Sequence, residues 1–378
     1  MSPAAAAGRR RRRAPWRVAV AVLLAACVTT VEEAPLLEFN APAPPLEPPP
    51  SLTIPFGETV AGPQQQLVDE FYRSVLRQLQ DAATSVDPAT GRHDVDLLGA
   101  LLARFERDDM PAGVRERVAG YRRIERGLRF CEGHAARAAR LELSPPAPDA
   151  DGNPVPVEQG APALGAPVRL ELRLPAGPEP ASLGGEDDDE PAGFLVHASI
   201  DDAFVEGSVR SHSRSDVVRL PEAFALAEGR ELRFPIVVDE PVGEAVRRTV
   251  VVRVSLLPGY VRLGGAAAPI PQTLLAEAKV AQWPAGYGAL QKAPLVELQA
   301  ALRQFEPRAF PRAWLAAVAT AGAPAADREA AIGMLLEPVR FGRADQAQVA
   351  MAALRELTGE PLLVGDRDAW LAWSQARR

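Results

Sequence analysis

The spacing of hydrophobic residues changes twice along this chain, and that change constrains the fold more than any other feature of the sequence. From Val168 to Leu174 hydrophobic residues alternate with charged ones, which is the pattern of a β-strand with one buried face. Before and after this region, hydrophobic residues recur at every third or fourth position, as on a helix that buries one face. We therefore predict an α+β multidomain fold with a β-domain between two helical domains.

The first helical domain is predicted to span 63–143. Two hydrophobic stripes at helical spacing indicate a helical hairpin, with a turn at 88–91 between its helices. A third helix is expected after Pro111, because proline suits the first turn of a helix, and it continues towards Arg140. The stripes consist of Leu67, Phe71, Val75 and Leu79 on the first helix and of Leu97, Leu98, Leu101, Leu102 and Phe105 on the second.

The β-domain is predicted to span 164–268, after a linker at 144–163 that is rich in proline, aspartate and glycine. A succession of short strands without a helical pattern is typical of an antiparallel sandwich of the immunoglobulin-like type. A Cys-Trp-Cys signature is absent from the sequence, so the prediction concerns architecture alone. Besides the strand that begins at Val168, the strand-like segments are 193–200, 216–220, 231–238 and 248–257.

The second helical domain is predicted to span 269–378. Its prolines, Pro338 among them, divide it into short helices that pack as antiparallel pairs. The segments 347–359 and 368–373 resemble the closing portion of HEAT-like repeat regions in bacterial envelope proteins. Several clean copies at one period are not found, so a degenerate helical bundle is the alternative. In the last segment, Trp370 and Trp373 either close the end of the core or expose an aromatic patch.

The first 26 residues have the three parts of an export signal. A basic stretch from Arg9 to Arg13 precedes an apolar stretch from Val18 to Leu24, and small residues follow. The apolar stretch has about half the length of a helix that spans a bilayer, so it is a poor permanent anchor. Residues 1–26 are therefore predicted to be a signal peptide.

Leu24-Ala25-Ala26-Cys27 resembles the bacterial lipobox, at which lipoprotein signal peptidase cleaves before an acylated cysteine. The resemblance implies cleavage between Ala26 and Cys27. It also implies two or three acyl chains on Cys27, which together make a lasting bilayer anchor. The alternative is an ordinary secretory signal with an incidental cysteine near its cleavage site.

The residue after Cys27 is Val28. In lipoproteins an aspartate at this position commonly retains the protein at the inner membrane. The resemblance therefore implies a location in the bacterial cell envelope, membrane-anchored at the periplasmic face of the outer membrane. Residues 27–62 are rich in proline and are predicted to form an extended tether.

The charge of the chain restricts its partners. Cleavage of the signal peptide removes six arginines and changes the formal net charge from -7 to -13. Binding of nucleic acid by bulk electrostatics needs a positive surface, which such a protein lacks. We therefore expect no nucleic-acid partner. The expected partners are the lipid bilayer, through acylated Cys27, and another envelope protein.

Acylation of Cys27 leaves Cys131 without a disulfide partner, because the chain contains 2 cysteines. We expect Cys131 to be buried as a small hydrophobic group, the alternative being a reactive thiol. Cys131 and His134 could supply two metal ligands, but a structural zinc site usually needs four. No metal and no cofactor is therefore expected.

Other polar residues were candidates for catalysis or for ion binding. His93 and His197 have no partner at a fixed spacing. The segment 211–216 contains the residue types of a hydrolase triad, but neighbours in a loop rarely converge on one atom, so we predict a polar turn. The acidic runs at 149–153 and 186–190 are interpreted as a turn and a solvated loop, and calcium binding by 186–190 is the alternative.

The sequence thus predicts a non-enzymatic envelope lipoprotein that acts as a protein-interaction or scaffolding module, with no catalytic residue assigned. Two alternatives stay open. One is an envelope hydrolase whose catalytic carboxylates are dispersed along the sequence. The other is a β-sandwich protein that binds carbohydrate.

Overall fold

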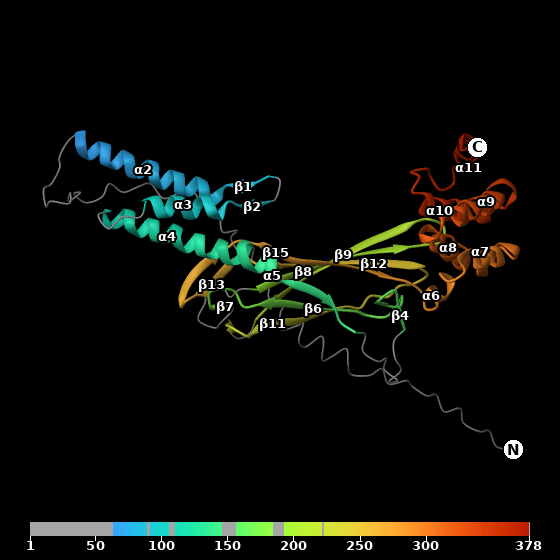
Figure 1. The fold of residues 1–378 in the computed structure, drawn as a ribbon, viewed down its shortest axis with the longest axis horizontal. Helices are drawn as coiled ribbons and strands as arrows, with labels where there is room; N and C mark the ends of the chain where they lie inside the picture. The colour runs from blue at the N-terminus through green and yellow to red at the C-terminus, as the bar shows by residue number, and fades with distance from the viewer. Residues whose placement is uncertain are drawn as a thin grey trace, which may run out of the picture. The chain divides into compact units, whose positions relative to one another are not determined.

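The computed structural model describes residues 63–88, 91–105, 110–145, 156–183, 193–220 and 223–377, all of which belong to the unit Leu46–Arg378. Helices come first in these residues, strands of antiparallel sheets follow, and helices return towards the C-terminus (Figure 1). The predicted mixed α+β fold is confirmed at this level.

Three helices pack together at the start of the described residues: α2 (Pro63–Thr84), α3 (Val95–Phe105) and α4 (Ala112–Leu128). A short antiparallel hairpin of β1 (Val86–Asp87) and β2 (Arg92–His93) lies between α2 and α3. The hairpin occupies the position of the predicted turn at 88–91.

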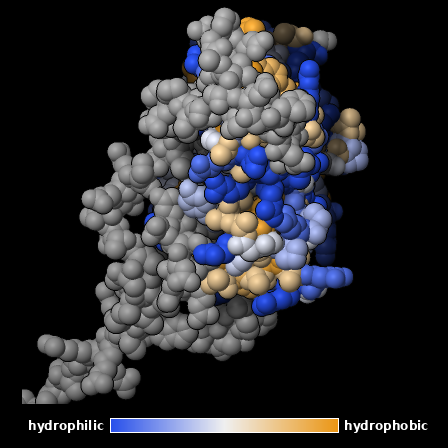
Figure 2. Space-filling model, turned by 90° about the vertical axis from the view of Figure 1, so that its left-hand side faces the viewer, coloured by the Kyte–Doolittle hydropathy of each residue, from blue (hydrophilic) through white to orange (hydrophobic). Residues whose placement is uncertain are grey.

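The two predicted hydrophobic stripes are buried only in part. Near the start of α2, Leu67 and Phe71 are 67% and 51% exposed. Figure 2 faces the side of the molecule on which these helices lie, and there hydrophobic side chains form small groups separated by hydrophilic ones. The core between the three helices includes Val75, Leu79, Leu98, Leu102 and Val118.

The middle of the chain forms antiparallel strands. They are β3 (Arg140–Leu143), β4 (Val157–Glu158), β5 (Ala161–Pro162), β6 (Val168–Pro175), β7 (Ala181–Leu183), β8 (Gly193–Ala203), β9 (Val209–Arg219), β10 (Phe224–Leu226), β11 (Glu231–Val238), β12 (Arg247–Leu256), β13 (Gly259–Leu263), β14 (Ala266–Ile270) and β15 (Thr273–Gln282). The largest sheets have the strand orders β15-β12-β8-β9, β11-β6-β3 and β10-β7-β13-β14. Strands β4 and β5 form a separate hairpin.

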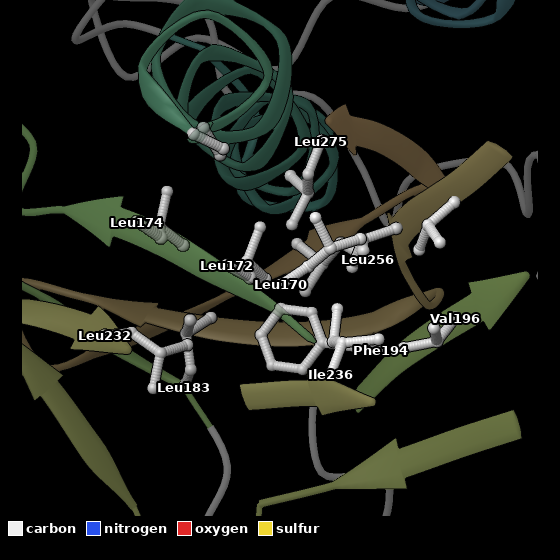
Figure 3. Close-up of a cluster of buried hydrophobic side chains, with 14 of the residues drawn as sticks. Leu170, Leu172, Leu174, Leu183, Phe194, Val196, Leu232, Ile236, Leu256 and Leu275 are labelled. Carbon is white, nitrogen blue, oxygen red and sulfur yellow. The ribbon is translucent and has the colours of Figure 1, made fainter. Parts of the chain in front are cut away.

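These sheets bury their inner faces in one shared hydrophobic core. Leu170, Leu172 and Leu174 enter it from one face of β6, as the alternation predicts, and each is at most 1% exposed. Phe194 of β8 and Leu256 of β12 enter it from the sheet that contains β9 (Figure 3). The sheet with β6 and the sheet with β9 are therefore packed face to face.

Strands extend beyond the predicted β-domain at both ends. Strand β3 lies in the predicted N-terminal helical domain, and β4 and β5 lie in the predicted linker. Strand β15 ends at Gln282, 14 residues after the predicted boundary at 268.

Strand β15 contains a bulge. Its register against β12 shifts next to Val254, which changes the residues that face the core. Leu275 is 3% exposed and Leu274 is 51% exposed. This bulge interrupts the period of two, so the spacing alone does not indicate the strand.

Helices return after Trp283. They are α6 (Tyr287–Leu290), α7 (Pro294–Arg303), α8 (Phe310–Ala319), α9 (Ala325–Phe341), α10 (Ala344–Thr358) and α11 (Arg367–Ala376), with single 3-10 turns at Pro307–Ala309 and Thr320–Gly322. Pro338 lies inside α9, so the helix end predicted at this proline is wrong.

Trp370 of α11 is fully buried, and the half-buried Trp373 packs edge-on against it with ring centroids 5.4 Å apart. These tryptophans close the end of the helical core.

Contacts with α10 fix the turn between β8 and β9. Arg355 of α10 donates a 2.7 Å hydrogen bond from Nη2 to the carbonyl of Gly207 in this turn. Gly207 has a φ of 83°, and an added Cβ would lie 2.9 Å from Cβ of Ala352, so both the backbone conformation and the close contact require glycine. Nearby, Arg247 of β12 forms a 3.0 Å ion pair with Glu356 of α10. The turn of the β8-β9 hairpin is thus held against α10.

Candidate functional site

The residues of the proposed anchor lie outside the described residues. Ala26 and Cys27, at the predicted cleavage and acylation site, belong to this part of the chain, and so does the acidic run at 186–190. Of the helices that the structure does describe, none is both long enough and apolar enough to cross a bilayer.

Cys131 lies on a π-helix that continues α4, η1 (Arg129–Ala135). Its side chain is fully buried. Burial raises the pKa of the Cys131 thiol to about 12, and a hydrogen bond with Thr273 offsets part of this effect. The thiol is therefore protonated and inaccessible at neutral pH, the state of a packing residue and not of a nucleophile.

Cys131 and His134 do not converge on a common point. His134 makes a 3.0 Å hydrogen bond from Nε2 to the carbonyl of Pro175, whereas Cys131 contacts Thr273. Within the described ranges, His, Cys, Asp and Glu side chains form no group of three or more that could hold a metal ion.

The π-helix also carries a histidine-carboxylate pair that sequence reasoning missed. Glu132 accepts a 2.8 Å hydrogen bond at Oε2 from the backbone N–H of His93, and its Oε1 lies 2.6 Å from Nδ1 of the same histidine. The side chain of His93 is 13% exposed and that of Glu132 is 10% exposed. π-Helical turns are frequent at functional sites. Here the carboxylate binds both backbone and ring of one residue, so its clear effect is to fasten the β1-β2 hairpin to the helix.

A second carboxylate lies about two helical turns earlier on the same face. Buried Glu125 accepts a 2.8 Å hydrogen bond from Nε of Arg129, which also reaches Asp96 of α3 at 3.5 Å. Gly99 of α3 allows this approach, because an added Cβ would lie 3.2 Å from Nη2 of Arg129. The spacing of 125, 129 and 132 on one helix face is the sequence signal for this polar cluster. The cluster joins α3, α4 and the β1-β2 hairpin.

The predicted candidates His197 and Ser215 are brought together by the β8-β9 pairing. Nδ1 of His197 lies 2.9 Å from Oγ of Ser215 on the exposed face of the sheet. A triad would need a carboxylate on the other ring nitrogen. Asp216 points to the opposite face of the sheet and binds Arg214 at 2.7 Å. Among the described residues, the ring of His197 therefore has no carboxylate partner that would complete a triad.

The segment 211–216 is not the predicted polar turn but the middle of strand β9. Strand β9 has 11 residues, pairs with β8 from Val209 to Arg219 without a register shift, and is exposed along most of its length. Serine, histidine and arginine alternate there, and neither face shows the hydrophobic alternation by which buried strands are recognised. That absence is why the sequence indicates a turn.

One edge of β9 carries backbone groups with no strand opposite them among the described residues, since β9 is the last strand of its sheet. At the turn, the amide of Phe204 donates to the carbonyl of Ser208 at 3.0 Å. Antiparallel residue pairs alternate between hydrogen-bonded and non-hydrogen-bonded. Even-numbered residues of β9 therefore direct their N–H and C=O groups at β8, and odd-numbered residues direct theirs outwards. The outward groups belong to Val209, Ser211, Ser213, Ser215, Val217 and Arg219.

The side chains of β9 divide between the two faces of the sheet. Even-numbered residues of β9 lie on the face where Val196 and Ile200 of β8 are buried. Val218 still packs against the core, but Arg210, His212 and Arg214 continue the row beyond it and are exposed. The outer face of the strand carries three serines between the exposed Val209 and Val217, with Arg219 at its end.

Strand β9 is basic in a protein of net negative charge. Arg214 binds Asp216 and lies 3.7 Å from Glu240. Arg210 instead covers the ring of Phe204, with Cζ 5.3 Å from the centroid. Neither Arg210 nor Arg219 has a carboxylate partner in the described part of the chain. Each end of the strand thus presents an arginine that has no carboxylate partner among the described residues.

Two cavities lie beside the sheets. One of about 300 Å³ opens at the start of β9 and is lined by Phe204, Glu206, Ser208, Val209 and Arg210. The other, of about 390 Å³, lies where β3 and β15 face each other, and Leu141, Leu143, Val280 and Trp283 are among its lining residues. The His93-Glu132 pair lines neither of them.

No protein-family model and no curated protein matches this chain.

Proposed function

We propose that this protein is a non-enzymatic lipoprotein of the bacterial cell envelope that binds another envelope protein. The observation that carries the proposal is the free edge of β9, an exposed strand of 11 residues. Natural edge strands are usually short, bulged or interrupted by proline, because a long regular edge pairs readily with another chain. Strand β9 has none of these three features, and its charged side chains restrict which strands can pair with it. An element of this kind is suited to strand addition by a partner.

The other polar pairs support the same proposal. Glu132 and His93 fasten a hairpin to a helix, and Arg129 binds Glu125 on its own helix and Asp96 on α3. His197 contacts Ser215 on the exposed face of the sheet, and the carboxylate of Glu277 on that face binds Arg253. These arrangements have structural roles, so the exposed strand edge is the better candidate for function.

We infer that acylated Cys27 anchors the protein and that residues 27–62 serve as the tether, with the outer membrane as the location. The lipobox resemblance at Leu24 to Cys27 supports this inference. An extended tether allows the folded part of a bilayer-bound protein to reach a partner that lies away from the lipid.

We also propose finer descriptions of the β-region and of the C-terminal helices. Two antiparallel sheets that share one core support an immunoglobulin-like sandwich for the β-region. Helices α9 and α10, which pack together in sequence order, support a HEAT-like arrangement of the C-terminal helices.

Site-specific photo-crosslinking in intact cells tests the proposed function. A photoreactive amino acid replaces Ser213 on the free edge of β9 or, as a control, the exposed Gln304 near the end of α7. We expect a discrete adduct with one envelope protein from position 213 and none from position 304. Equal adducts from both positions, or no adduct from either, would contradict the proposal.

A further inference from the structure

We propose that the partner of β9 is an extended acidic segment of another protein, which adds to the free edge as a further strand. This inference rests on the proposed function and names the chemistry of the partner. It follows from two separate properties of β9, its unpaired backbone groups and its unneutralised arginines.

The backbone supplies the first part of the argument. Outward-pointing N–H and C=O groups recur at every second residue from Val209 to Arg219. An extended polypeptide can satisfy them without any side-chain requirement. The hairpin is fixed at its turn by the bond from Arg355 to Gly207, so the edge is preorganised and little ordering is needed on binding.

The side chains supply the second part. An added strand would place alternate side chains next to Arg210, His212 and the Arg214-Asp216 pair on one face, with Arg219 at the end of β9 on the other. Charged residues on an edge strand oppose pairing with neutral or basic strands. They do not oppose an acidic strand, since opposite charges on neighbouring strands attract. The arginines therefore select the charge of the occupant.

A second copy of this chain fits the edge less well. In the antiparallel β9-β9 pair with full overlap, Arg214 lies opposite Arg214 of the second copy, and Asp216, the acidic residue of the strand, already binds Arg214. An acidic segment on a different protein brings no arginine against Arg214.

The test uses a defined probe peptide. It is blocked at both ends, alternates glutamate with threonine and valine, and carries a fluorophore, while a control peptide has lysine in place of glutamate. Binding to the Cys27→Ala protein is measured by fluorescence anisotropy at low and high salt. We expect the glutamate peptide to bind at least about tenfold more tightly than the lysine peptide, and binding to weaken with salt because the charges are exposed.

Matched variants locate the site. Ser213→Pro removes one outward N–H and blocks the edge, whereas Ser213→Ala keeps that N–H. We expect the proline variant to bind at least about tenfold more weakly and the alanine variant to bind within about twofold of the wild type. The double variant Arg210→Glu/Arg219→Glu should lose at least about tenfold in affinity for the glutamate peptide and gain affinity for the lysine peptide.

The outcomes separate this inference from the proposed function. Equal binding of both peptides, or wild-type binding by the Ser213→Pro variant, overturns the acidic-strand inference, and a position-specific adduct at 213 in cells then still supports a partner at β9. A wild-type dimer in sedimentation that becomes a monomer on Ser213→Pro substitution also overturns it, because the occupant is then a second copy. Absence of both the adduct and peptide binding overturns the proposed function as well.

Discussion

At the scale of single residues, Gly127 shows how closely the N-terminal helices contact the sheets. A Cβ at this position of α4 would lie 1.9 Å from the carbonyl oxygen of Pro269 in β14, a distance that no packing adjustment of side chains can relieve. The backbone of helix and strand touch there, and glycine is the residue that permits it.

We therefore expect Gly127→Ala to lower the free energy of unfolding by about 1–3 kcal/mol, because the helix must move away from the strand. Gly120 on the same helix is the matched control, since an added Cβ there meets nothing within 4 Å. Gly120→Ala should be neutral or stabilising by up to about 1 kcal/mol through better helix propensity. Urea denaturation measures both, and equal effects would contradict the contact.

Cys131 gives a second prediction at this scale. Because burial raises the pKa of its thiol to about 12, the reactive thiolate is scarce below that pH and appears only as the pH approaches it. In the Cys27→Ala protein, Cys131 is the remaining thiol. We expect it to react with an aromatic disulfide reagent at about pH 8 only after denaturation. Fast labelling of the folded protein would show that the thiol is accessible.

At the scale of elements, the two edges of β9 should differ in their response to proline. Ser213 directs its N–H outwards, whereas Arg214 directs its N–H at β8. Ser213→Pro should therefore cost less than about 1 kcal/mol of stability, and Arg214→Pro about 3 kcal/mol or more, because only the latter breaks a ladder hydrogen bond. Thermal unfolding followed by circular dichroism measures the difference. The reverse order would mean that the alternation along β9 is opposite to the one inferred.

The elements that sequence reasoning predicted are those that bury one face. Leu170, Leu172 and Leu174 alternate with charged residues and form β6, and the stripe from Val75 to Leu79 forms the buried part of α2. The sequence predicts such elements, because burial of one face places hydrophobic residues at the repeat of a helix or a strand.

The elements that sequence reasoning missed either do not bury one hydrophobic face or depend on contacts between distant residues. Strand β9 buries neither face completely, so serines and arginines replace the hydrophobic alternation. The pair of Glu132 with His93 joins residues 39 positions apart, and no local spacing encodes such a contact. Candidate sites built from long-range pairs become visible only in the folded chain.

At the scale of the whole molecule, the proposed acylation of Cys27 determines which membrane surface the folded part lies beside. We expect cells to incorporate labelled palmitate into the wild-type protein and into the Cys131→Ala variant, because acylation needs Cys27 alone. The Cys27→Ala variant should remain unlabelled, since it lacks the thiol that receives the acyl chains. Label in the Cys27→Ala variant would contradict the lipobox prediction.

The free edge of β9 is the central claim, and amide hydrogen exchange observed by NMR tests it most directly. In the protein alone, we expect the amides of Ser211, Ser213 and Ser215 to exchange fast and those of His212 and Arg214 to be protected by β8. On addition of the glutamate peptide, the first set should become protected. Protection of Ser211, Ser213 and Ser215 before the peptide is added, or no change after it, would show that this edge is not a binding site.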